Sequence, residues 1–284
     1  MEEKLIHGSP HHENLLTSGQ SNLLSTQARP VPVVGFISAP AFFDPSPHEF
    51  KTAVKEQVFT QQAFPLLPNF DYSLDSIASE QLAERFCLCA ESLRAAKCDL
   101  LVQVGSPFAW ANVNSEAEAR QRNERITKAA NIPSIMTSLA IIDALRSHKV
   151  HKIAITSTYY SSIWSNCFAN FVSMCGFEVL HTSNFYEQQL VKTINKNEHF
   201  KYTDSEMPNM VKASVQFVKA IAPESQAIII VGTGAKTLNI LCELEVIANC
   251  PVIPADTVVY WLIAQSLNLS LLPNMGRFRD LFSQ

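Results

Sequence analysis

The sequence predicts an α/β protein of two similar, pseudo-symmetric lobes, each a parallel β-sheet flanked by helices, with a cleft between the lobes. Three observations support this fold class. Short runs of β-branched, apolar residues alternate with longer segments whose apolar residues recur every three or four positions. This alternation starts again near residue 150. Two of the apolar runs end in a glycine followed by a hydroxyl residue, at Gly105-Ser106 and at Gly232-Thr233, as expected of an internal repeat.

The first 29 residues are rich in Ser, Asn, Gln and His and are predicted to be a flexible tail. They contain no basic stretch followed by an apolar core, so a secretory signal is not expected. His7, His11 and His12 could bind a metal, but a solvated tail is the favoured interpretation. No metal site is therefore expected.

The first half of the ordered chain is predicted to alternate strands and helices. Apolar residues at helical spacing, among them Leu82, Phe86 and Leu93, indicate an amphipathic helix. Thr137 is a candidate N-cap for the helix that follows it. In chain order the predicted elements are a strand at 31–38, a strand near 58–64, a helix at 78–97, a strand at 99–104, a helix at 115–130 and a helix at 138–148.

The second half repeats this order. Gly176 is expected to end its first helix, because glycine is common just after a helix C-terminus. In chain order the predicted elements are a strand at 152–157, a helix at 161–175, a strand at 177–180, helices near 186–196 and 206–222, a strand at 227–231, a helix at 237–248, a strand at 251–255 and a helix at 257–267.

The repeat and its boundaries predict how the chain is divided into domains. Residues 1–29 form the tail, residues 30–136 together with 255–284 form lobe 1, and residues 137–254 form lobe 2. Ligands of such sheets bind beyond the carboxyl ends of the strands. Two facing lobes would bring both glycine-hydroxyl turns into one cleft.

The composition excludes several classes of partner. The chain has 284 residues, 47% hydrophobic and 17% charged, with a net charge of -4 and no cluster of Lys or Arg. Neither nucleic acid nor an anionic membrane is an expected partner. No apolar run approaches the length of a membrane span. The seven cysteines form no CxxC pair, which fits reduced thiols and a cytoplasmic location.

Three segments could carry chemistry at strand ends. At Gly105-Ser106 the backbone can approach a ligand closely, and the serine N–H and hydroxyl can both donate to a carboxylate, although a plain strand-to-helix turn is equally plausible. The turn at 232–237 offers backbone N–H groups before a helix, yet its spacing does not fit a nucleotide phosphate loop. Residues 156–160 add hydroxyl donors, for which packing is the simpler interpretation. Asp44 and Glu49 flank His48 and are interpreted as a charged loop.

Taken together, these segments resemble the aspartate/glutamate racemase superfamily, and within it the branch of arylmalonate decarboxylase and maleate isomerase. The matching stretches run in family order from about residue 31 to residue 268. They are VVGFISAPAFFDPSP, DLLVQVGSPFAWAN, IMTSLAIIDALRSHKVHKIAITSTYY, GFEVL, AIIIVGTGAKTLNILCELE and PVIPADTVVYWLIAQSL.

The resemblance assigns roles to particular residues. Racemases of this superfamily carry a cysteine at each of two strand ends, and arylmalonate decarboxylases keep the second one. Here those positions correspond to Gly105 and Gly232. The resemblance implies that Ser106, Tyr159 and the backbone of Thr233 and Gly234 hold a substrate carboxylate, with Gly105, Gly232 and Pro40 also in the binding site. Pro107 stands where the decarboxylases have a donor, so the carboxylate site is altered there. Tyr159, Ser106 and Thr233 are the candidate catalytic residues.

The resemblance therefore implies a cofactor-independent lyase or isomerase acting on a small carboxylate or dicarboxylate, with Tyr159, Ser106, Thr233 or water in place of a thiol. Preorganised N–H and O–H donors can stabilise the negative charge that develops during such a reaction. Two alternatives stay open because both cysteine positions hold glycine. One is a homologue that binds a carboxylate without catalysis. The other is a hydrolase-like enzyme that uses an activated water in the same cleft.

Overall fold

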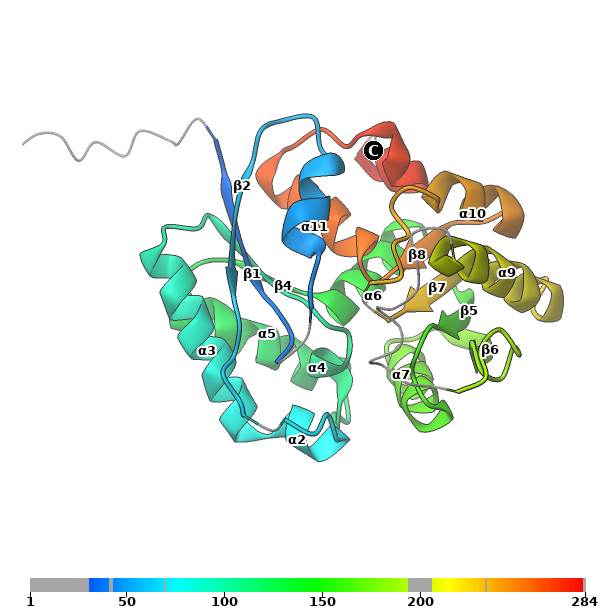
Figure 1. Ribbon diagram of the computed structural model, residues 1–284, viewed down its shortest axis with the longest axis horizontal. Coiled ribbons are helices and arrows are strands. Elements are labelled where there is room, and N and C mark those ends of the chain that lie inside the picture. The colour runs from blue at the N-terminus through cyan, green and yellow to red at the C-terminus, as the bar shows by residue number, and fades with distance from the viewer. Residues whose placement is uncertain (1–30, 41–42, 69, 194–205, 233, 283–284) are drawn as a thin grey trace, which may run out of the picture. The chain divides into compact units, whose positions relative to one another are not determined.

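The computed structural model describes residues 31–40, 43–68, 70–193, 206–232 and 234–282. Its framework is two parallel β-sheets of four strands each, flanked by helices (Figure 1). This architecture confirms the predicted α/β fold class. Residues Val31–Gln284 form one compact unit, so the division of that unit into lobes at residues 136 and 255 stays a prediction. The predicted tail at 1–29 lies outside the described residues.

The two sheets repeat one strand order, which is the structural counterpart of the sequence repeat. The first sheet has the order β2-β1-β3-β4 and the second has the order β6-β5-β7-β8. The strands of the first sheet are β1 (Val33–Ile37), β2 (Phe59–Ala63), β3 (Leu100–Gln103) and β4 (Ser134–Met136). The strands of the second sheet are β5 (Lys152–Ser157), β6 (Glu178–Asn184), β7 (Ala227–Val231) and β8 (Val252–Pro254).

The central strands β1, β3 and β7 are buried along their whole length, as expected for parallel strands covered on both faces.

Serine side chains cap several helices, because a serine oxygen accepts a hydrogen bond from a free backbone N–H of the first turn. The α-helices described are α1 (Ser46–Glu49), α2 (Leu74–Ala78), α3 (Glu80–Ala95), α4 (Pro107–Trp110), α5 (Glu116–Ala130), α6 (Thr137–Ser147), α7 (Ser162–Met174), α9 (Glu206–Ile221), α10 (Leu241–Ala248) and α11 (Thr257–Leu267). Two 3-10 segments, η1 (Phe50–Thr52) and η2 (Pro273–Phe282), complete the set.

Two helices connect the sheets. Helix α6 follows β4 and α11 follows β8, the last strand of each sheet, and the two helices pack against each other. Helix α6 also contacts β8, while α11 contacts β3 and β4. Tyr260 and Trp261 on α11 are almost completely buried. Each sheet is therefore covered in part by the helix that follows the other sheet.

Three sequence predictions are corrected by the structure. The sequence predicted no strand at 134–136, where the short strand β4 pairs with β3; three residues are too few to show a periodic pattern. Thr137 does not cap α6: it is the first residue of that helix, and its hydroxyl donates to the Gln103 carbonyl and accepts from the Gly105 amide at the end of β3. The described part of the predicted helix at 186–196 forms turns rather than a helix.

Candidate functional site

The two glycine turns have the same backbone conformation. Gly105 follows β3 with φ of 112°, and Gly232 follows β7 with φ of 113°. Both values lie in a region that L side chains rarely adopt. Because β3 and β7 hold the same place in the two sheet orders, the turns occupy equivalent carboxyl ends of strands. That is where ligands of open α/β sheets bind.

Neither glycine position has room for a side chain. A Cβ atom on Gly105 would lie 2.5 Å from the Phe108 ring. A Cβ atom on Gly232 would overlap the Thr158 hydroxyl and lie 3.1 Å from the Tyr159 ring. The two turns are thus closed over by neighbouring side chains, with Phe108 on the first and Thr158 and Tyr159 on the second.

Ser106 lies in a buried polar and aromatic network. Its hydroxyl accepts a hydrogen bond from the Trp110 indole Nε1 at 3.1 Å and is hydrogen-bonded to the Tyr160 hydroxyl. Its carbonyl oxygen accepts a hydrogen bond from Ser138 Oγ at 2.8 Å. Ser106 is 1% exposed, and burial raises the pKa of Tyr160 above its usual value. The sequence reading did not select Tyr160 for the site.

Tyr159 lies beside the other glycine. Its ring is next to Gly232 and packs edge-on against Tyr160, with ring centroids 5.4 Å apart. A continuous chain of contacts therefore runs from Ser106 through Tyr160 and Tyr159 to Gly232. The structure brings these predicted residues into one region, while their roles in binding and catalysis stay predictions.

Thr158 belongs to the hydroxyl-rich segment 156–160, but the sequence did not single it out as a site residue. It is 3% exposed, and its backbone N–H donates to the Val231 carbonyl at 3.1 Å. Its hydroxyl is buried and has no hydrogen-bond partner among the described residues. An unpartnered buried hydroxyl is costly, so its position above Gly232 marks a place where a ligand oxygen would be favoured.

Pro40 follows β1 and is buried. Its carbonyl accepts a hydrogen bond from the Tyr72 hydroxyl, and burial raises the pKa of that phenol above its usual value. Tyr72 has φ of 54°, which is uncommon for a large side chain. The tyrosine therefore connects the loop after β1 to the segment before α2, a contact that no local pattern in the sequence indicates.

The turn after β7 is described except for Thr233, a predicted site residue that lies outside the described residues. Gly234 and Lys236 both have positive φ, at 88° and 55°. The turn ends in Thr237, whose hydroxyl donates to Asp256 Oδ1 at 2.6 Å. The backbone of this segment is strongly bent before α10 begins at Leu241.

A buried acidic cluster lies next to that turn. Asp256 is 4% exposed, and Oδ2 of its carboxyl group has no hydrogen-bond partner among the described residues. The Tyr260 hydroxyl donates to Glu49 Oε2 at 2.7 Å. Burial, together with the nearby Asp256 carboxylate, raises the pKa of Glu49 to about 7, and burial also raises the pKa of Asp256.

The interpretation of Asp44 and Glu49 as a charged surface loop is wrong. Asp44 is 5% exposed, accepts a hydrogen bond from Ser38 Oγ at 2.6 Å and binds the Ser46 amide. Glu49 is half-buried on α1 against Tyr260 of α11. Sequence spacing could not reveal this arrangement, because Glu49 and Tyr260 are far apart along the chain.

Two buried thiols, those of Cys89 and Cys175, are not activated, and neither follows a glycine turn. Burial raises the pKa of Cys89 to about 11 and that of Cys175 to about 12. The nucleophile and the acid in thiol chemistry both require a pKa near the working pH. Within the described ranges no group of three or more His, Cys, Asp or Glu could hold a metal ion, and no helix there is long and apolar enough to cross a membrane.

A family model for arylmalonate decarboxylase matches residues 72–278 of the chain. No curated protein matches the sequence significantly. The family match covers both glycine turns and Tyr159.

Solved structures with the same fold have low sequence identity to this chain. An unliganded arylmalonate decarboxylase covers 88% of this chain and 99% of its own, with 16% identity and a TM-score of 0.69. A variant of maleate isomerase Iso from Pseudomonas putida S16, solved with maleate, covers 88% of this chain and 97% of its own, with 17% identity and a TM-score of 0.72. A variant of the Nocardia farcinica maleate cis-trans isomerase with a covalently bound succinylcysteine intermediate covers 88% and 98%, with 12% identity and a TM-score of 0.68.

Proposed function

Because the chain belongs to the arylmalonate decarboxylase family, we propose that it is a cofactor-independent lyase or isomerase acting on a small carboxylate or dicarboxylate. The family match spans both glycine turns. Decarboxylation and cis-trans isomerisation of such acids place one common requirement on the binding site. The site must hold a carboxylate so that negative charge developing beside it is stabilised.

The unpartnered Thr158 hydroxyl is the observation that carries this proposal. It is a buried donor at the carboxyl end of β5, directly above Gly232. Leaving such a group unpaired costs roughly 1–3 kcal/mol. In the proposal, a bound carboxylate oxygen accepts its hydrogen bond and recovers that free energy.

The remaining donors are the ones that the sequence selected. Tyr159 adds a phenol beside the same turn, and the backbone N–H groups of Thr233 and Gly234 add donors before α10. Because neighbouring side chains occupy the Cβ positions of both glycines, a ligand at these turns would contact Phe108, Thr158 and Tyr159. In this proposal Ser106 and Pro40 contribute to the site from the first sheet.

The proton in this reaction must come from an oxygen acid. Loss of CO2 from a malonate-type substrate leaves a carbanion that takes up one proton at the same carbon. Neither glycine turn carries a thiol, so we assign the proton to Tyr159, Ser106, Thr233 or a water held by them. Of these side chains, Tyr159 has its ring beside Gly232, whereas the Ser106 hydroxyl lies in the network with Trp110 and Tyr160.

One observation favours a second function, binding of a carboxylate without catalysis. Phe108, Thr158 and Tyr159 fill the space in which family members with cysteines would carry their thiols. Turnover separates the two proposals. The catalytic proposal requires CO2 release from a malonate or interconversion of maleate and fumarate, and the binding proposal requires stabilisation by the same acids without either reaction.

The test uses Thr158→Val, which replaces the unpartnered hydroxyl with a methyl group of similar size. We expect malonate or maleate binding, measured by calorimetry, to weaken about tenfold or more, because a hydrogen bond to a charged group is worth roughly 1.5–3 kcal/mol. The free variant should melt at the same temperature or higher, since it loses a buried unpaired donor.

Thr182→Val is the matched control. Its hydroxyl is also buried and has no partner in the described part of the chain, but it lies on β6, away from the glycine turns. This variant should keep full affinity. Unchanged affinity in Thr158→Val would remove the basis of the proposed site.

A further inference from the structure

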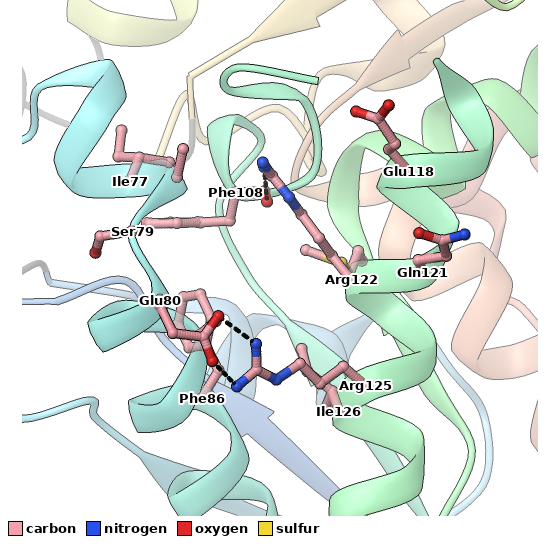
Figure 2. A pocket seen from close by; sticks show the side chains of 13 residues that line it. Ile77, Ser79, Glu80, Phe86, Phe108, Glu118, Gln121, Arg122, Arg125 and Ile126 are labelled. Atoms are coloured by element: carbon pink, nitrogen blue, oxygen red, sulfur yellow. Dashed lines mark hydrogen bonds and ion pairs between the residues drawn. The ribbon is translucent and has the colours of Figure 1, made fainter. Parts of the chain in front are cut away.

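A pocket lies between α2, α3, α4 and α5 (Figure 2). Its volume is about 340 Å³, at the small end of the range of roughly 300–1,000 Å³ that is typical of ligand sites. Its apolar lining consists mainly of Ile77, Phe86, Phe108, Ile126 and Met136. A pocket of this size accepts one ring or a short branched chain.

Two arginines of α5 border the pocket, and they differ in their partners. Arg125 is paired with Glu80, with one nitrogen–oxygen distance of 2.7 Å and a second, shorter contact (Figure 2). Arg122 donates only to the Phe108 carbonyl at 3.2 Å and has no carboxylate within ion-pair distance among the described residues. Glu118, the nearest acid on α5, accepts a hydrogen bond from the Asn114 amide.

The Arg122 guanidinium is therefore only partly satisfied. It has five N–H donors, of which one is used. Burial lowers the pKa of this guanidinium, and Glu118 opposes that shift only in part. A planar guanidinium with free donors is suited to a carboxylate, which it can bind through two parallel hydrogen bonds.

We propose that this pocket binds a small monocarboxylate with an aromatic or branched apolar body, its carboxylate on Arg122 and its body on the Phe86–Phe108–Met136 floor. The site is separate from the proposed carboxylate site at the glycine turns. It does not depend on whether the protein is an enzyme.

Phe108 connects the pocket to the first glycine turn. Its ring packs edge-on against Phe86, at 5.1 Å between centroids, and also lies over Gly105. Its carbonyl is the group that Arg122 binds. A ligand carboxylate on the remaining donors of Arg122 would share the guanidinium with that carbonyl, so we expect occupancy to alter the segment from Gly105 to Trp110. The proposal therefore includes a regulatory effect on the Ser106 region.

The experiment uses phenylacetate as the probe and methyl-labelled methionine NMR as the readout. A phenyl ring on the floor should shift the Met136 methyl resonance, and the Trp110 indole N–H resonance should move with it because that group donates to Ser106. Calorimetry gives the affinity. Arg122→Gln should weaken phenylacetate binding about tenfold or more, equivalent to 1.4 kcal/mol.

The controls separate this pocket from the glycine turns. Arg125→Gln removes the other arginine of the rim, and Tyr159→Phe alters the proposed carboxylate site; both should keep the Met136 shift. Acetate lacks the apolar body and benzyl alcohol lacks the charge, so each should bind about tenfold more weakly or worse.

Two results would overturn the binding pocket, and a third would overturn its coupling to the Ser106 turn. One is a Met136 methyl that does not move at about 10 mM phenylacetate, a concentration that reveals millimolar affinity. Another is full binding by an Arg122→Gln variant with a normal melting curve. The third, a shift of Met136 without any shift of Trp110, would remove the coupling to the Ser106 turn.

Discussion

At the scale of single residues, the two glycines are the most constrained positions of the candidate site. Each combines a positive φ with neighbours that occupy the place of a side chain. The packing around these turns therefore leaves no room for a cysteine side chain at either position. A change at either glycine alone would have to displace Phe108 or Thr158.

Gly232→Cys tests this packing. We expect the substitution to destabilise the fold by about 1–3 kcal/mol, because the new Cβ overlaps the Thr158 hydroxyl and the backbone is in a strained region for an L residue. The double variant Gly232→Cys with Thr158→Ala should recover part of that loss. Urea unfolding measures both, and equal stability of wild type and single variant would contradict the packing described here.

Tyr159→Phe tests the phenol of the proposed carboxylate site. Binding of malonate should weaken about tenfold or more, since one hydrogen bond to a charged group is removed. If turnover exists, its rate should fall as well. The melting temperature should change little, because the ring and its edge-on contact with Tyr160 remain. Full affinity and full rate in this variant would leave Tyr159 as a packing residue.

At the scale of elements, each sheet passes into its last helix through a threonine. Thr137 begins α6, where its hydroxyl donates to the Gln103 carbonyl and accepts from the Gly105 amide, both at 3.2 Å. Thr257 begins α11 at the equivalent place, but its hydroxyl has no partner among the described residues. The two halves thus share a topology and differ in how the strand-end turn is held.

Thr137 and Thr257 allow a matched test of whether the hydroxyl at the start of the helix stabilises the fold. Thr137→Val should cost about 1–3 kcal/mol of folding stability, because it leaves a buried amide and a buried carbonyl unpaired. It should also speed hydrogen exchange at the Gly105 amide. Thr257→Val should be neutral or stabilising, since it removes an unpartnered hydroxyl. Similar losses in both variants would show that the threonine at Gly105 has no special role.

At the scale of the whole molecule, buried carboxyl groups make folding stability depend on pH. The pKa values of Glu49 and Glu245 are both raised to about 7, mainly by burial. A carboxyl group whose pKa is raised on folding is favoured in its protonated form. The free energy of unfolding that such a group contributes is therefore fully present below about pH 4.5 and is lost as the pH rises through about 7.

Melting temperature should accordingly fall between about pH 5 and pH 8. In the Glu49→Gln variant the free energy of unfolding should change less across that interval, by on the order of 2–3 kcal/mol, because the amide cannot ionise. Burial lowers the pKa of His148 to about 4. This histidine has the opposite effect to the two glutamates, because it destabilises the fold as the pH falls below about 6.5. A pH profile of Glu49→Gln that parallels the wild type would show that Glu49 ionises freely in the folded state.

Local periodicity was enough to predict most of the elements of this fold. The strands at β1, β3, β5 and β7 and the helix α11 were predicted within one or two residues, because long apolar runs and helical repeats are properties of neighbouring residues. The strand β4 was missed because three residues carry no period. Helix α10 begins at Leu241, four residues later than predicted, since the bent turn after Gly234 occupies the interval.

What the sequence determined by itself was the α/β class, the repeat and the positions of the two glycine-hydroxyl turns, because these depend on local order along the chain. The tertiary structure alone decided which groups meet at the turns. The Thr158 hydroxyl lies over Gly232, the Tyr160 hydroxyl bonds to Ser106, and Glu49 accepts a hydrogen bond from Tyr260, which lies near the other end of the chain. Those contacts join residues that are distant in sequence, so no local pattern predicts them. Burial determines their hydrogen bonds and pKa values, and it arises only when the sheets pack together.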